Sequence, residues 1–249
     1  MSEHSQIKGS EINVNASPDN PAALQLGSAD DAFSRGGNRL CFVHPGDSNR
    51  CIKVLRSDRL PAIKRSEKSF PKNLKSLDAF DDNAQEMVVY EKIQKCIGES
   101  AFELIPRCYG YLDTNLGAGL CSDMIRDDDG QIAITLKQYL WQYGKTAEIL
   151  LCIEQFGQRW QELGMPSRNL LLHNIVIQCR NGVPDRLYVI DGLGWSDLFP
   201  IGYLLPSQAR RKAGKKIRTL AMAIDALLYK KEHKIHYGYH GWITDNKRR

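Results

Sequence analysis

Two polar residues border hydrophobic, β-branched segments in the second half of this sequence. Asn174 directly precedes residues 175–177, and Asp191 directly follows residues 187–190. The turn residues at 181–182 between these segments predict a short hairpin, which would bring the two side chains to one end. Their amide and carboxylate oxygens are hard ligands of the kind that hold Mg²⁺ against phosphate. The alternative is that both residues only cap their strands, as Asn and Asp often do.

A lysine inside an apolar segment is the second feature that could take part in chemistry. Lys53 has apolar neighbours on both sides, in a strand predicted over residues 50–55. Because side chains alternate along a strand, the lysine must face a solvated cleft or a charged partner. Glu86, in a helix predicted over residues 83–97, is the best candidate for that partner, with Glu91 second. The alternative is an edge-strand lysine in open solvent.

Two consecutive glycines lie between predicted strands. Gly36 and Gly37 fall in a turn at residues 34–39, between strands predicted at 24–26 and 40–43. The backbone N–H groups of such a loop can approach phosphate closely, so the pair is a candidate for cofactor binding. A plain hairpin loop explains the same residues, since they do not form a G-x-G-x-x-G pattern.

These residues follow the order found in protein-kinase-like folds. The segment from Arg168 to Asn174 has the spacing of the kinase catalytic loop, H-R-D-x-x-x-x-N, and Asp191 stands where such folds hold their metal. In that arrangement Lys53 grips nucleotide phosphates and Glu86 holds the lysine. The similarity predicts a site for ATP and Mg²⁺, with Lys53, Glu86 and the glycine turn at the nucleotide and Asn174 and Asp191 at the metal.

Two positions depart from the kinase pattern. Asn169 stands where kinases have their aspartate base, and an amide cannot accept a proton from a substrate hydroxyl at neutral pH. Leu171 stands where many kinases have a lysine that meets the transferred phosphate. Arg168 would support the loop or pair with acidic groups, and Gly192 would let the chain turn away after Asp191. The candidate catalytic residues are therefore Asn169, Arg168 and Asp191. The aspartate base and the lysine that contacts the transferred phosphate are both missing.

Composition places the chain among globular proteins without a membrane span. Of its 249 residues 42% are hydrophobic and 25% charged, and its apolar runs are far shorter than the roughly 18 residues that cross a bilayer. The N-terminal residues show no apolar signal core, which predicts a cytoplasmic location. Seven cysteines without a C-x-x-C pair predict reduced thiols that pack as small hydrophobic side chains.

The net charge of +5 is concentrated late in the chain. From Arg210 onward basic residues far outnumber acidic ones. Such a surface attracts nucleic acid or anionic lipid, although a solvated face of a terminal helix explains it as well. Three nearby histidines, His233, His236 and His240, lack acidic or cysteine neighbours, which favours a structural role over a metal site.

The predicted elements change from strands to helices along the chain. Strands at 24–26, 40–43, 50–55, 108–112 and 119–125 accompany one helix at 83–97, and helices at 136–141, 148–163 and 220–229 accompany the later hairpin. This order predicts an α+β, two-lobed protein-kinase-like fold. Its parts would be a flexible tail at 1–20, a small antiparallel β-rich N-lobe with one helix at 21–125, and a mainly helical C-lobe with a short β-hairpin at 126–249.

Several segments resemble the PhoP regulatory network protein family, whose members are YrbL-like. The similar segments are residues 37–45, 50–54, 86–90, 105–107 and 174–176. The whole resemblance covers about residues 35 to 200. The resemblance implies a kinase-like fold in a bacterial, cytoplasmic protein. The base position of that family is not reliably aspartate, which would make Asn169 a family trait.

Three functions are compatible with these residues. An atypical kinase would transfer the γ-phosphate of ATP to a small molecule, a lipid-linked sugar or a protein, with the hydroxyl oriented by Asn169 or activated by Asp191 and metal. A pseudokinase would bind nucleotide and present a surface to a regulatory partner. The less favoured third function is binding of nucleic acid or an anionic surface through the basic region from Arg210. The sequence identifies neither the acceptor nor the oligomeric state.

Overall fold

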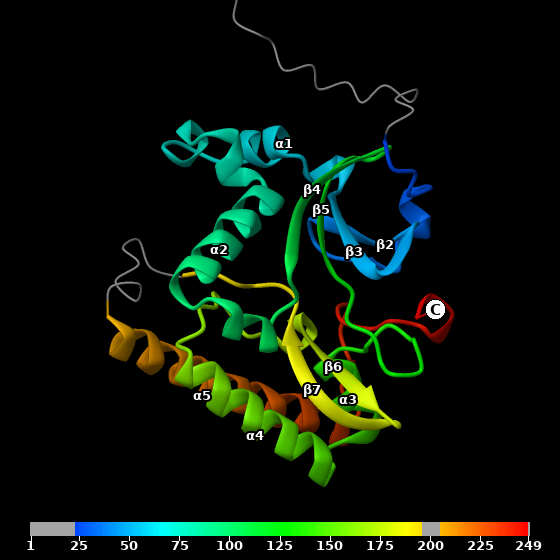
Figure 1. The fold of residues 1–249 in the computed structure, drawn as a ribbon, viewed down its shortest axis with the longest axis vertical. Coiled ribbons are helices and arrows are strands. Elements are labelled where there is room, and N and C mark those ends of the chain that lie inside the picture. The colour runs from blue at the N-terminus through cyan, green and yellow to red at the C-terminus, as the bar shows by residue number, and fades with distance from the viewer. Residues whose placement is uncertain (1–22, 196–204, 249) are drawn as a thin grey trace, which may run out of the picture.

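A computed structural model describes residues 23–195 and 205–248. Its first half contains a five-stranded antiparallel sheet (Figure 1), in which the chain forms short hairpins and strands that pair with their neighbours. Across the sheet the order is β1 (Ser34–Arg35), β2 (Arg39–His44), β3 (Asp47–Leu55), β5 (Gly117–Asp123) and β4 (Cys108–Thr114).

The pairing of β2 with β3 separates apolar from reactive side chains. Cys41 lies opposite Lys53, and Leu40 lies opposite Val54. Because alternate residues face opposite sides, Arg39, Cys41 and Lys53 share one face of the sheet. The other face carries Leu40, Phe42, Ile52 and Val54, which form a buried cluster. The expectation that Lys53 turns away from its apolar neighbours is thus confirmed.

Helix α2 (Asp82–Cys96) lies between β3 and β4 in the chain and confirms the helix predicted over 83–97. The side chain of Asp81 caps its start by accepting hydrogen bonds from the backbone N–H groups of Asn83 and Ala84. The buried face of the helix carries Glu86 together with Tyr90 and Ile93, at spacings of three and four residues. The same face therefore anchors α2 in the core and presents one carboxylate to the sheet.

Two sequence predictions in the first half need correction. Residues 24–26 do not form a strand: Leu24 makes only an isolated parallel bridge to Thr114, and the N–H of Leu26 donates to the Asn115 side chain. The first strand of the hairpin is instead β1. The polar residues between β3 and α2, for which no element was predicted, contain helix α1 (Pro61–Ser66) and three short 3-10 helices, Ser57–Arg59, Lys72–Leu74 and Leu77–Phe80.

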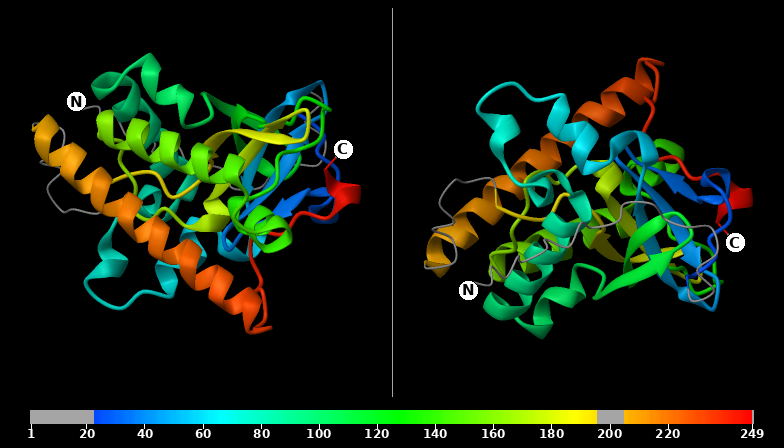
Figure 2. Two further views of the ribbon diagram at one scale, coloured as in Figure 1. Left: turned by 90° about the horizontal axis from the view of Figure 1, so that it is seen from below. Right: turned by 90° about the horizontal axis from the view of Figure 1, so that it is seen from above.

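The second half is mainly helical and holds the predicted hairpin. Its elements are α3 (Leu136–Tyr143), α4 (Ala147–Glu162), β6 (Ile175–Arg180), β7 (Val183–Val189) and α5 (Pro206–Glu232). Figure 2 shows α4 and α5 lying along each other. Side chains of these helices, the hairpin and α2 share the largest hydrophobic cluster, around fully buried Trp160.

Helix α5 has 27 residues and is much longer than the predicted 220–229. Its buried residues continue upstream through Ala213, so the stripe that packs on α4 starts earlier than the strongly apolar residues indicate. Lysine, arginine and alanine, which fill the upstream turns, are good helix formers.

After α5 the chain returns to the sheet. Figures 1 and 2 show its last described residues beside the N-terminal strands, where the Lys247 Nζ donates to the backbone carbonyl of Ala32 at 2.8 Å.

The expected α+β class with an antiparallel sheet is confirmed. The tail predicted at 1–20 lies outside the described residues. Among the helices that the structure describes, none has the length and apolarity needed to cross a membrane.

Candidate functional site

A cavity of about 430 Å³ lies between the sheet, α2 and the end of the β6–β7 hairpin. Its lining draws on residues far apart in the sequence, from the glycine turn after β1 to the segment that follows α5. Of the residues predicted for the site, seven line it: Gly36, Gly37, Lys53, Glu86, Arg168, Asn174 and Asp191. The fold thus gathers most of the predicted set around one space.

Lys53 and Glu86 form the expected pair at the inner wall of the cavity. The Lys53 Nζ lies 2.6 Å from Glu86 Oε1 and also donates to the carbonyl of Ile190 at 2.8 Å. Both side chains are less than 10% exposed. Burial disfavours the charge of Lys53, but Glu86 overcomes this effect and raises the lysine pKa. A fixed ammonium group therefore faces the cavity from β3.

Arg39 is a second buried cation that sequence reasoning missed. Its guanidinium contacts Glu86 through Nη1 and Asp191 Oδ1 through Nη2, the latter at 2.9 Å. Burial works against its charge, yet Glu86 and Asp191 raise the pKa of Arg39 well above the ordinary value. Strand alternation could have revealed it. Arg39 lies two residues before Cys41, which pairs with Lys53, so Arg39 and Lys53 face the same side of the sheet.

Asp191 is a carboxylate held among cations. Its side chain is half exposed, and burial tends to raise its pKa. Arg39 and Lys53 prevail and hold that pKa below the usual value, helped by the backbone N–H of Gly192, which donates to Oδ1 at 2.7 Å. Asp191 therefore carries its negative charge at neutral pH.

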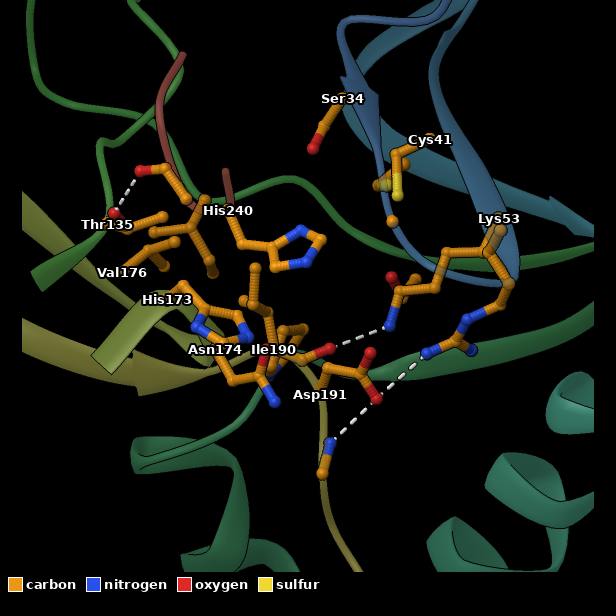
Figure 3. A pocket seen from close by; sticks show the side chains of 18 of the residues that line it. Ser34, Cys41, Lys53, Thr135, His173, Asn174, Val176, Ile190, Asp191 and His240 are labelled. Atoms are coloured by element: carbon orange, nitrogen blue, oxygen red, sulfur yellow. Dashed lines mark hydrogen bonds and ion pairs between the residues drawn. The ribbon is translucent and has the colours of Figure 1, made fainter. Parts of the chain in front are cut away.

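Asn174 and Asp191 are brought together as predicted. The N–H of Ile190 donates to the Asn174 carbonyl at 2.9 Å, which fixes the two chain segments side by side. Figure 3 shows both side chains at the cavity, next to Lys53. Asn174 ends a short 3-10 helix, Leu172–Asn174, before β6 begins.

These two side chains fit a divalent cation that shares phosphate ligands. Among the described residues, both hydrogen-bonding partners of Asp191 use Oδ1, which leaves Oδ2 for a cation. Within the same residues, no three His, Cys, Asp or Glu side chains gather into a metal site of their own. An amide oxygen and a carboxylate oxygen would therefore need phosphate and water oxygens to complete the six ligands of Mg²⁺.

Gly192 allows this close arrangement. It has a φ of +79°, and a Cβ there would lie 2.9 Å from the Asn169 carbonyl oxygen and 3.1 Å from the Asn174 Nδ2. The carbonyl of Gly192 accepts the N–H of Arg168 at 2.9 Å. The turn after Asp191 is thus packed directly against the loop predicted to be catalytic.

The predicted catalytic-loop residues occupy different places. Arg168 lines the cavity and donates from Nη2 to Gln85 Oε1 of α2 at 3.1 Å. Asn169 is exposed and does not belong to the cavity lining, while its backbone carbonyl packs against Gly192. The amide side chain at the expected base position is therefore not among those that line the cavity.

The glycine turn is anchored by an arginine. The carbonyls of Gly36 and Gly37 accept hydrogen bonds from Arg56 Nη1 at 3.2 and 3.1 Å. With these carbonyls turned to Arg56, the turn forms one rim of the cavity between β1 and β2.

The histidines at the cavity were not assigned a function by the sequence. His173, next to Asn174, faces His240 with ring centroids 5.6 Å apart, and both line the cavity (Figure 3). Burial, His240 and Lys137 lower the pKa of His173, so its imidazole is neutral at pH 7. His233 instead stacks on Tyr229. The three late histidines thus have separate surroundings.

The basic residues of α5 are partly used within the molecule. Arg210 Nε donates to the Glu162 carbonyl at 3.0 Å, and Lys216 Nζ donates to the Arg168 carbonyl. All seven cysteines are free, as predicted, although Cys96 is exposed.

These observations define an α+β protein with a charged cavity between its antiparallel sheet and its helices. The model of the family described as PhoP regulatory network protein YrbL matches residues 25–225 of the chain, so the chain belongs to that family. The proteins named "Uncharacterized protein YrbL" in Escherichia coli K12 and Shigella flexneri are each 26% identical to it over 184 residues, which cover 70% of this chain and 75% of each relative.

Removing Arg39 tests the charge network. We expect Arg39→Met to lower the free energy of unfolding by about 3 kcal/mol or more, because it leaves buried Glu86 with one cation fewer and Asp191 without its guanidinium partner. Urea denaturation at pH 7 measures the loss. The control is Arg59→Met, whose 3.4 Å pair with Glu67 is exposed and should contribute less than about 1 kcal/mol. Equal losses would contradict a buried network centred on Glu86.

The close packing at Gly192 gives a second prediction. Gly192→Ala combines left-handed strain with contacts to Asn169 and Asn174, whereas Gly130→Ala at a φ of +82° meets no atom within 4 Å. We expect a loss of about 1 kcal/mol in the free energy of unfolding for Gly130→Ala and a clearly larger one for Gly192→Ala. Equal losses in urea denaturation would show that the turn after Asp191 has room for a side chain.

Proposed function

We propose that this chain binds ATP with Mg²⁺ in the cavity and has the two-lobed arrangement of kinase-like proteins. In this interpretation residues 21–125 form the N-lobe and residues 126–249 the C-lobe. The observation that carries the proposal is the buried Lys53–Glu86 pair, which places a fixed cation next to the carboxylate of Asp191 in one cavity. A triphosphate with its metal requires such a combination of cation and hard oxygen ligands.

The cavity has two chemically different ends. Lys53, Arg39, Asn174 and Asp191 form a charged end, which suits the phosphates. Apolar side chains that suit a flat heteroaromatic base also line the cavity: Cys51, Met124, Ile132 and Ile243 form one cluster, here called the base end. A nucleotide is the ligand class that combines both properties, and the volume of about 430 Å³ lies within the range of small-molecule sites.

The charges at the phosphate end support a role for metal. Lys53 and Arg39 are balanced by Glu86 and Asp191, so this group of four is neutral before a ligand binds. The charge of a bound Mg²⁺ would offset that of the phosphates. Asn174 and Asp191 would hold the ion, and Lys53 would hold a phosphate. Arg39 would keep Asp191 oriented or move its contact to a phosphate oxygen.

The geometry supports nucleotide binding better than phosphotransfer. Asn169 is exposed and outside the cavity lining, and Arg39 already pairs with the proposed metal ligand Asp191. These two observations favour a pseudokinase, a nucleotide-responsive regulatory module. An atypical kinase is the second candidate, since phosphoryl transfer depends mostly on positioning and charge neutralisation. Neither candidate function specifies the phosphate acceptor or the regulatory partner.

Ligand-dependent stability tests the binding proposal. We expect ATP with Mg²⁺ to raise the melting temperature, because a ligand at 100 times its Kd stabilises a fold by about 2.7 kcal/mol. Lys53→Met should lose most of this shift. Lys145→Met, which removes only an exposed pair with Asp225, should keep it. The proposal is wrong if the wild-type protein shows no shift and no heat of binding.

Turnover separates the two candidate functions. A pseudokinase should bind ATP and release no more phosphate or ADP than the buffer does, and Asn169→Asp should restore little activity because position 169 lies outside the cavity. A Mg²⁺-dependent turnover that Asp191→Asn abolishes would identify a phosphotransferase instead. General-base catalysis is typically worth about 10²–10⁴ in rate, so a restored base within reach of the site would be readily detected.

A further inference from the structure

The segment from residue 237 to residue 248, here called the return segment, forms part of the cavity although it lies beyond the family match at 25–225. His240, Gly241, Trp242 and Ile243 all line the cavity. Figure 1 shows the segment running from the end of α5 toward the N-terminal strands. This wall of the cavity is therefore not covered by the part of the chain that defines the family.

The return segment is anchored to α3 by three polar side chains. Thr135 Oγ1 donates to the Gly241 carbonyl at 2.5 Å, and Lys137 Nζ donates to the His240 carbonyl at 2.8 Å. Gln138 makes two bonds to Ile243: its Nε2 donates to the carbonyl, and its Oε1 accepts the N–H, both at 2.9 Å. Gln138 is 2% exposed, so this clamp is protected from water.

Farther on, the return segment contacts the sheet side of the cavity. Ile243 is buried in a cluster with Cys51 of β3, Met124 and Ile132. The Arg248 backbone carbonyl accepts the N–H of Ile132 at 2.6 Å, and its guanidinium pairs with Asp127 at 2.7 Å. The segment thus connects α3, the chain after β5 and the sheet on the apolar side of the cavity.

Gly241 marks where the return segment comes closest to the proposed metal loop. It has a φ of +86°, and a Cβ at this position would lie 2.5 Å from the His173 Cβ and 3.2 Å from the Thr135 Oγ1. Contacts this short force a displacement of the backbone. A side chain at 241 would therefore move the segment away from His173, the neighbour of Asn174.

The return segment lines the cavity without filling it. With the segment in place the cavity still encloses about 430 Å³, and the charged end remains part of the same space. Ile243 is buried in an apolar cluster with Cys51, Met124 and Ile132, and all four line the cavity.

We propose that the return segment is a specificity-determining wall of the cavity, in which Ile243 shapes the end that accepts the heteroaromatic base of a nucleotide. This inference rests on the proposed nucleotide-binding function and adds the chain's own base-recognition element to it. The segment acts on the base and not on the phosphates, which are held by Lys53, Arg39, Asn174 and Asp191.

Titration calorimetry with ATP and with inorganic triphosphate, each with Mg²⁺, tests the proposal at a temperature where every variant is folded. We expect Ile243→Ala to weaken ATP binding about tenfold or more, and to change triphosphate binding less than about twofold. Tyr239→Ala is the control within the segment, because Tyr239 is 94% exposed. This control should bind ATP as the wild type does.

Amide hydrogen exchange on the wild-type protein gives a measurement that no substitution affects. ATP should slow exchange in residues 237–248, whereas inorganic triphosphate should leave it unchanged.

The outcomes distinguish this inference from the function on which it rests. If the wild type binds neither ATP nor triphosphate, the proposed function fails and the inference fails with it. If ATP binds but Ile243→Ala retains wild-type affinity, or loses ATP and triphosphate equally, the base wall is wrong while nucleotide binding stands. Unchanged exchange in residues 237–248 with ATP would overturn the inference in the same way.

Discussion

The carboxylate of Glu86 is the interaction on which the site depends. It is buried on α2 and faces two cations from neighbouring strands, Arg39 of β2 and Lys53 of β3. A buried charge is tolerated only when it is paired and hydrogen-bonded, so each of the three groups requires the others. The orientation of α2 against the sheet is consequently tied to the side chains that face the cavity, and Asp191 joins the same network through Arg39.

Local pattern was enough to predict part of this arrangement. The apolar neighbours of Lys53 required it to leave the core face, and the order of residues in kinase-like folds indicated Glu86, in the following helix, as its partner. The hairpin followed from β-branched runs around a turn, and it brought Asn174 to Asp191. The strand and the hairpin needed only residues close in sequence, whereas the Lys53–Glu86 pair needed the similarity to a known fold.

Long-range packing explains what the sequence did not predict. Arg39 at the start of a strand, beside glycines, has the pattern of a solvated residue, and only the positions of Glu86 and Asp191 bury it. Residues 24–26 have the composition of a strand but form a single β-bridge instead of pairing along their length with a neighbouring strand. The return segment shows no periodicity, because single anchors such as Gln138 hold it instead of a continuous apolar stripe. The upstream half of α5 was missed because its buried residues are small.

The two bonds between Gln138 and Ile243 have a consequence for how this wall tolerates change. Because Gln138 binds both the N–H and the C=O of Ile243, it fixes which residue of the segment lies beside α3, since a shift by one position would break both bonds. Residues 233–236, between α5 and Ile243, are exposed. Insertions or deletions there can be absorbed as a change in loop length, while Ile243 keeps its place. The length of the connection and the shape of the cavity can therefore vary independently over evolutionary time.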